Sequence, residues 1–240
     1  MKENIVFMKS IVLLLLVVFL YGFTTKRNDQ RKVLAPIVEF SNGDNLFLSH
    51  EMVNKLLIQK VGRVENEPKS LINLHEFENR VNENSLVEHT KVYMTIDGSI
   101  KALITQRTPV ARVNTGSEVY YIDKQGLKMP LSTNYSARVL LVSGAVTEQD
   151  IPAVFSLVKK INGNEFLTNL IVGIHKYSTS EYVLQTRLFD QHIQLGKIVD
   201  LNTKFKKLEA FYNKAIQDKD IENYKTINLK YNNQVVCTKD

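Results

Sequence analysis

The residues best suited to chemistry in this 240-residue chain are its five histidines, and they are scattered along it. They are His50, His75, His89, His175 and His192. His75-Glu76 begins like the zinc motif HExxH, but Asn79 stands where the second histidine is needed. His175 lies in an apolar run, where we expect a structural role. The spacing therefore predicts no metal site.

Other patterns that carry chemistry are also missing from the sequence. The carboxylate pairs Glu65/Glu67 and Glu76/Glu78 lie in polar segments, whereas general acid–base catalysis needs a shifted pKa in a cleft. No G-x-S-x-G, GxGxxG or GxxxxGK[ST] motif occurs, and the single Cys237 excludes a disulfide framework or a CxxC site. We therefore predict that the chain is not an enzyme and uses no cofactor.

Composition predicts a folded globular protein whose excess charge lies at one end. The chain is 44% hydrophobic and 23% charged, with a formal net charge of +6. Residues 1–32 contain six basic and two acidic residues, whereas residues 33–240 contain 25 basic and 23 acidic ones. The folded part is thus almost balanced, which argues against nucleic-acid binding.

An apolar segment near the N-terminus is long enough to be a membrane anchor. The strictly apolar run covers residues 11–23, and it extends back to residue 5 if Lys9 reaches the headgroups. Its anchor residues include Ile11, Leu14, Val17 and Leu20. A cleaved signal peptide is the alternative, but the run leaves through Tyr-Gly-Phe-Thr-Thr, a poor cleavage site. An uncleaved anchor after a short N-terminus, residues 1–10, is favoured.

The orientation of the anchor is ambiguous by charge. Two basic residues precede the span and four follow it, which by simple counting places the N-terminus outside. That count loses weight when a long domain must be translocated.

Past a polar linker at residues 24–35, the hydrophobic periodicity predicts two α+β domains. Residues 36–112 follow a strand–helix–helix–strand–strand order, with helices that begin after Ser49 and Asn73 and a hairpin that turns at Asp97-Gly98. Two helices on a small sheet in this order are typical of a POTRA domain. Other small modules share the order.

Residues 113–240 are predicted to be a mixed, strand-rich domain with flanking helices. Strands are expected at 118–122, 126–129, 138–143, 170–176, 182–189, 193–195 and 225–236. One helix is expected from Thr147 or Asp150 to Ile161, and a long amphipathic helix spans Phe205 to Ile216.

Several short motifs together resemble the bacterial cell-division family FtsQ/DivIB, in particular its Bacteroidetes-like members. They are QRTPVARV at 106–113, VYYIDKQG at 119–126, KMPLS at 128–132, LVSG at 141–144 and INLKY at 227–231. Asn228 and Lys230 depart from the family's usual Asp and Arg, and Lys230 loses the bidentate pairing of a guanidinium.

The resemblance implies a non-enzymatic scaffold of the divisome that helps to control septal peptidoglycan synthesis. Its partners would be FtsB and FtsL at the β domain, with FtsK, FtsW and FtsI as further ones. It implies a single-pass protein of the inner membrane, with a cytoplasmic N-terminus, a periplasmic bulk and enrichment at the septum. The alternatives are another POTRA-containing envelope assembly protein and a secreted enzyme with an unrecognised site.

With this resemblance, we expect the final strand to bind a partner through its edge. A terminal strand often leaves one row of backbone groups unpaired, which an extended segment can satisfy. The expected contact residues are Asn228, Lys230, Tyr231, Asn232, Asn233 and Gln234, with apolar contacts from Phe211 and Tyr212.

Overall fold

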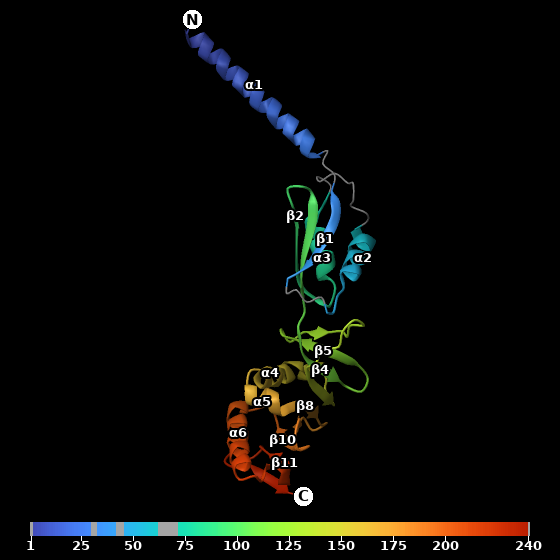
Figure 1. Ribbon diagram of the computed structural model, residues 1–240, viewed down its shortest axis with the longest axis vertical. Helices are drawn as coiled ribbons and strands as arrows, with labels where there is room; N and C mark the ends of the chain where they lie inside the picture. Colours follow the sequence, from blue (N-terminus) through green and yellow to red (C-terminus); the bar gives the residue numbers. More distant parts are fainter. Residues whose placement is uncertain (1, 30–32, 42–45, 62–71, 240) are drawn as a thin grey trace. The chain divides into compact units, whose positions relative to one another are not determined.

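A computed structural model of the chain describes residues 2–29, 33–41, 46–61 and 72–239. The chain divides into two compact units, residues 1–106 and 107–240, each with its own sheet. The predicted α+β class, with an N-terminal apolar helix and a strand-rich second domain, is confirmed (Figure 1).

The apolar segment is part of helix α1, Lys2–Asp29. Its stretch Met8–Asn28 is long and apolar enough to cross a membrane. The expected linker at 24–35 is wrong for its first part, because the helix continues to Asp29. The Thr24 hydroxyl donates to the Leu20 carbonyl (2.8 Å) and the Thr25 hydroxyl to the Tyr21 carbonyl (2.8 Å), which satisfies both hydroxyls within the helix.

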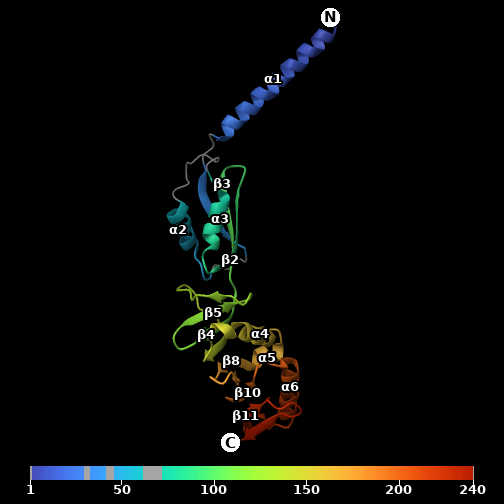
Figure 2. The same ribbon diagram turned by 180° about the vertical axis from the view of Figure 1, so that it is seen from behind.

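The first unit has the predicted β-α-α-β-β order. Its elements are β1 Leu34–Phe40, α2 His50–Val61, α3 Leu74–Asn82, β2 Val87–Met94 and β3 Ser99–Gln106. β3 lies between the other two strands, parallel to β1 and antiparallel to β2. Helix α3 packs on β2 and α2 on β1, and the two helices contact each other (Figure 2).

Local signals in the sequence explain where these two helices begin. The Ser49 hydroxyl accepts the Met52 amide (3.2 Å), and the Asn73 side chain accepts the Glu76 amide (3.2 Å). From inside the sheet, the Gln106 side-chain oxygen accepts the amides of Phe47 (3.0 Å) and Leu48 (3.1 Å). This glutamine fixes the segment that leads into α2.

The second unit contains the remaining elements. They are β4 Pro109–Asn114, β5 Val119–Asp123, β6 Lys128–Met129, β7 Leu140–Gly144, η2 Glu148–Asp150, α4 Ile151–Asn162, α5 Glu165–Leu170, β8 Ile171–Lys176, β9 Tyr182–Thr186, β10 His192–Gly196, α6 Leu201–Gln217, η3 Ile221–Asn223, β11 Tyr224–Asn228 and β12 Val236–Lys239. The described strands lie in the order β12-β11-β10-β9-β8-β7-β4-β5-β6.

The boundary between the units lies six residues earlier than the expected 112/113, between Gln106 and Arg107. The expected boundary cuts through β4. This strand pairs with β5 and β7 of the second sheet, and Ala111 and Val113 are fully buried in the second core. Packing rather than chain order therefore assigns β4 to the second unit.

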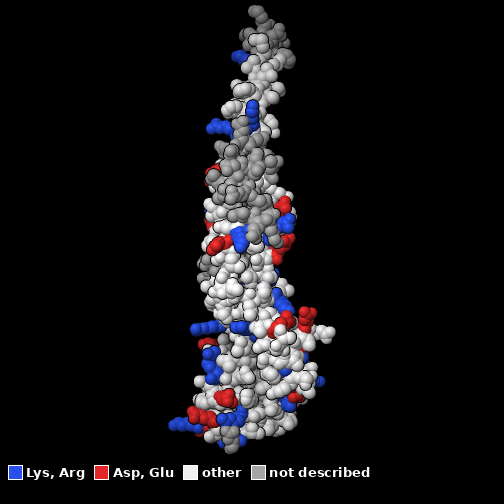
Figure 3. All heavy atoms as spheres, turned by 90° about the vertical axis from the view of Figure 1, so that its right-hand side faces the viewer, with Lys and Arg blue, Asp and Glu red and all other residues white. Residues whose placement is uncertain are grey.

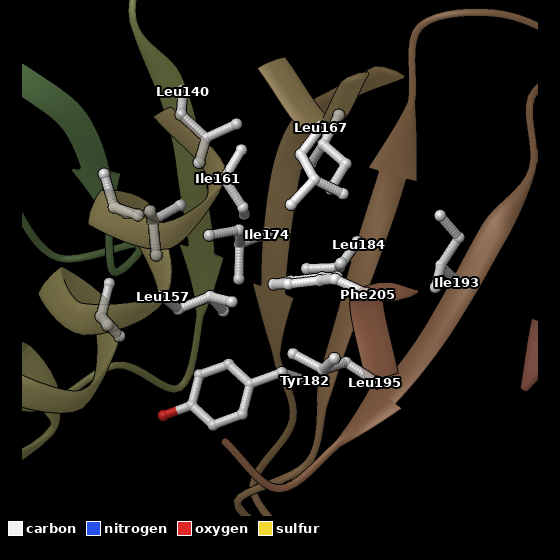
Figure 4. Packing of buried hydrophobic residues seen from close by; sticks show 14 of the residues in the cluster. Leu140, Leu157, Ile161, Leu167, Ile174, Tyr182, Leu184, Ile193, Leu195 and Phe205 are labelled. Carbon is white, nitrogen blue, oxygen red and sulfur yellow. The ribbon is translucent and has the colours of Figure 1, made fainter. Parts of the chain in front are cut away.

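The core of the second unit fills the space between the sheet and its helices. Leu157 and Ile161 of α4 and Phe205 of α6 meet Ile174 and Leu184 of the sheet (Figure 4). The predicted stripes on α4 and α6 are buried at Val154, Val158, Leu208, Tyr212 and Ala215, but Ile216 is exposed. In both ribbon views α4, α5 and α6 cover the same side of the strands.

Candidate partner-binding edge

Strand β12 lies at one end of the second sheet. Val236–Lys239 pairs antiparallel with β11, and among the described residues no other strand pairs with it. A strand with one neighbour presents a row of backbone N–H and C=O groups on its outer side. Val236, Thr238 and Lys239 are exposed. This edge can be extended by an added strand, and it is longer than the opposite edge strand β6, which spans only Lys128–Met129.

The expected single strand at 225–236 is wrong. Two strands, β11 and β12, form a hairpin around a loop at residues 229–235. The Asn228 side chain causes the turn: its oxygen accepts the Lys230 amide (2.9 Å), and its amide donates to the Gln194 side chain (2.8 Å). Ile227 and Leu229 are fully buried as expected.

The structure therefore moves most of the predicted edge residues away from the edge. Asn228 ends β11, which is enclosed by β10 and β12. Tyr231, Asn232, Asn233 and Gln234 are exposed as a contact surface requires, but they lie in the loop and not on the edge strand. Lys230 forms an ion pair with Glu181 at 3.4 Å.

The loop is held against helix α6. The Lys207 ammonium donates to the Asn232 carbonyl (3.2 Å) and also to the Tyr231 carbonyl. One turn further on, the Phe211 ring lies edge-on to Tyr224 of β11 with centroids 5.2 Å apart. Phe211 is half-buried, so part of it remains available beside the hairpin.

Tyr212, in contrast, is a core residue and cannot contact a partner. It is 3% exposed, and its hydroxyl donates to the Gln191 side-chain oxygen. Burial raises the pKa of its phenol above the ordinary value. The expectation that Tyr212 lines the docking surface is therefore wrong.

An ion pair fixes the end of β12. Lys239 contacts Asp220 at 2.6 Å, and its ammonium lies 4.9 Å from the centre of the Tyr224 ring. The hydrogen bond from Lys239 lowers the pKa of Asp220, and the same bond raises the pKa of Lys239. Both groups therefore stay charged near neutral pH.

The reactive and metal-ligating side chains of the unit do not gather into a site beside this edge. Burial raises the pKa of the Cys237 thiol, which keeps it protonated. His175 contacts the Ser143 hydroxyl through Nδ1 (3.0 Å) and the Tyr177 ring. In the part of the chain that the structure describes, no three His, Cys, Asp or Glu side chains gather as a metal site would require.

The anchor residues form a separate feature. Ile11, Leu14, Val17 and Leu20 are all exposed on α1. Phe19 and Phe23 stack on each other rather than on the sheet. An apolar helix with no buried part fits a single-pass membrane protein.

Strand β12 was not among the elements expected from the sequence. Val-Val-Cys-Thr at 235–238 is a short β-prone run, and Asn232-Asn233 before it is a turn signal. These two signals are the local features from which the hairpin could have been found. The Asp220–Lys239 pair depends on folding and leaves no local signal.

Comparison with known proteins supplies one finding. Residues 108–238, which include the second sheet except for Lys239 at its end, match the family model described as FtsQ/DivIB, C-terminal related. No curated protein matches the chain.

Proposed function

The chain belongs to the FtsQ/DivIB, C-terminal related family, and from this membership we propose that it is a non-enzymatic scaffold that acts in bacterial cell division. The family match covers the unit that carries the exposed edge. The apolar helix α1 would tether this unit and the β-α-α-β-β unit to a membrane.

The observation that carries this proposal is the edge of β12 within the family-matched unit. β-Augmentation needs a stable strand whose outer backbone groups are free to pair. The hairpin is held in place by the buried side chains of Ile227 and Leu229. It is also held by the Lys239–Asp220 ion pair and by the contacts of Lys207 with the loop. We propose that a segment of FtsB, bound to FtsL, adds a strand here.

The two other parts of the proposal concern recruitment and location. The first unit would act as a POTRA-like recruitment module for the division site, with FtsK, FtsW and FtsI as further contacts. The N-terminus would be cytoplasmic and both units periplasmic, at the septum of the inner membrane. The β-α-α-β-β order and the long translocated part support these two points.

The test of the cell-division role is crosslinking in dividing cells. The tagged full chain is crosslinked, solubilised and purified, and co-purified proteins are identified by mass spectrometry. We expect the FtsB–FtsL pair to be recovered. Recovery of envelope-assembly proteins without any divisome component would contradict the proposal.

The test of the edge uses two neighbouring proline variants, Cys237→Pro and Thr238→Pro. Consecutive N–H groups in a strand point to opposite sides, so one variant removes an outward donor and the other removes a bond to β11. We expect one variant to lose FtsB–FtsL binding with unchanged thermal unfolding, and the other to lose stability. Asn233→Ala in the loop is the control and should change neither.

A further inference from the structure

A groove of about 510 Å³ lies in the second unit, where β4, β7 and β8 begin. Three arginines line it: Arg112 from β4, Arg138 from the segment before β7 and Arg187 after β9. The lining residues include no Asp or Glu. The groove therefore concentrates positive charge, whereas on the face drawn in Figure 3 basic and acidic side chains are interspersed.

The guanidinium groups keep most of their donors available. Arg112 donates through Nη1 to the Ser136 hydroxyl (3.3 Å), and Arg187 donates through Nε to the Asn169 carbonyl (3.3 Å). Arg138 is exposed. Within the described part of the chain, none of the three forms an ion pair with a carboxylate, although each guanidinium offers five donors.

The groove also has an apolar component. Leu141 is 56% exposed although it lies inside β7, between the buried Leu140 and Val142. The register places it between Arg112 on β4 and Gly173 on β8, so one neighbour has no side chain to cover it. Val110 and Val172 line the same groove and are half-buried. An exposed leucine beside arginines is a typical composition for a binding surface.

We propose that this groove binds an acidic peptide segment of a partner protein, one that carries an apolar side chain among its carboxylates. Guanidinium groups pair with carboxylates through two parallel hydrogen bonds, which gives both affinity and orientation. Leu141 supplies apolar contact that a free inorganic anion would not use. The volume also suits several residues better than one small ion.

The groove is separate from the edge of β12. β8 and β12 are four positions apart in the strand order, which corresponds to roughly 19 Å at the usual strand spacing. The two surfaces can therefore be tested independently, and the groove proposal does not rest on the cell-division role.

The test measures binding of a fluorescein-labelled peptide, Glu-Glu-Leu-Glu-Glu, to the detergent-solubilised full chain by fluorescence anisotropy. We expect the triple variant Arg112→Gln, Arg138→Gln and Arg187→Gln to weaken binding by about 30-fold. Leu141→Ser should weaken it by about 5-fold through lost apolar contact. Binding should also weaken as salt is raised.

Matched controls separate the groove from general charge. The variant Lys159→Gln, Lys160→Gln and Lys197→Gln removes the same charge elsewhere on the unit and should leave binding within 2-fold. Equal weakening by this control would overturn the proposal. Tighter binding of inorganic polyphosphate than of the peptide would make the groove a phosphate site, and equal binding of Glu-Glu-Ser-Glu-Glu would remove the role of Leu141. Either result would also overturn it.

Discussion

At the residue scale, the buried side chains of Gln191, Lys176 and Lys204 in the second unit each have specific hydrogen-bond partners. Gln191, 1% exposed, is the clearest case. Its amide donates to the carbonyls of Ile221 (2.7 Å) and Tyr224 (3.0 Å), and its oxygen accepts the Tyr212 hydroxyl. One side chain thereby links the turn before β10 to α6 and to the start of β11.

Gln191→Leu should therefore destabilise the second unit strongly. The substitution keeps the volume but removes three buried hydrogen bonds, to two carbonyls and a hydroxyl, which we expect to lower the free energy of unfolding by about 3 kcal/mol. Urea unfolding followed by circular dichroism measures this. Tyr212→Phe, which leaves one acceptor unpaired, is the milder comparison at about 1 kcal/mol. Equal stability of Gln191→Leu and the unchanged chain would contradict the prediction.

The ion pair between Lys176 and Asp150 predicts how folding stability depends on pH. Lys176, largely buried, donates to Asp150 (2.8 Å) and to the Ala145 carbonyl (2.7 Å), while Thr147 donates to the same carboxylate. Burial alone would raise the pKa of Asp150, but the hydrogen bonds from Lys176 and Thr147 outweigh it and the pKa is lowered. Folding therefore favours the ionised form.

The direction of the pH dependence follows from the difference between the pKa of Asp150 in the folded and in the unfolded state. A carboxyl whose pKa is lower in the folded state contributes stability that is complete above about pH 4 and is lost as the pH falls through the lowered pKa. We expect Asp150→Asn to reduce this acid dependence and to cost about 3 kcal/mol at pH 7, because Lys176 is left buried without its counter-charge. Unfolding midpoints of the unchanged chain and of Asp150→Asn, measured between pH 7 and pH 2, test this prediction. An unchanged pH profile in the variant would assign the acid dependence to other groups.

At the element scale, the turn after β7 depends on a glycine. Gly144 has φ +96°, and a Cβ there would lie 2.1 Å from the Lys176 carbonyl oxygen of the neighbouring strand β8. We expect Gly144→Ala to lower the free energy of unfolding by about 3 kcal/mol, from backbone strain and displacement of β8 together. Gly116→Ala is the matched control.

Gly116 also has a positive φ, +87°, but nothing lies within 4 Å of a Cβ there. Its substitution should cost only about 1 kcal/mol, the conformational part of the effect. Thermal unfolding of the two variants compares them directly. Similar losses in both would mean that the close approach of β7 and β8 carries no cost.

Elements with local signals could be predicted from the sequence, and those that depend on distant pairing could not. Ser49 and Asn73 cap helices as expected, and Gly126 adopts φ +84° in the turn between the strands expected on either side of it. Asn164, three residues past the expected helix end at Ile161, is the cap of the unexpected helix α5, and its side chain accepts the Leu167 amide (3.0 Å). The same residue type ends one helix and begins the next.

The candidate edge could be predicted only in part, for the same reason. The alternation at Ile227 and Leu229 correctly identified a buried strand near the C-terminus. Which strand forms the edge depends on the pairing of Asn228 with Val236 across the hairpin and with Gln194, which is 34 residues away in the sequence. Periodicity within one segment contains no information about such partners.

At the scale of the whole molecule, exposed apolar surface is concentrated on α1. All described side chains from residue 8 to residue 28 are exposed, whereas the periodic apolar residues of both sheets are largely buried. We expect residues 33–240, expressed without α1, to remain in the soluble fraction, while the full chain sediments with membranes. Ultracentrifugation of cell lysates measures this. Aggregation of a correctly folded 33–240 fragment would indicate that a partner must cover the edge or the groove.

We also expect α1 to remain attached to the mature protein and not to be cleaved off as a signal peptide. Signal peptidase requires small residues at the two positions of an A-x-A site after an apolar run, but Tyr21 and Phe23 occupy such a pair here and the helix continues past them to Asp29. We expect intact-mass analysis of the membrane fraction to find these residues attached. The double variant Tyr21→Ala with Phe23→Ala creates small residues at both positions and should be cleaved and released, which makes it a positive control. A mature chain that begins near Thr24 without these substitutions would show that the segment is a signal peptide, and the scaffold would then need another attachment to the membrane.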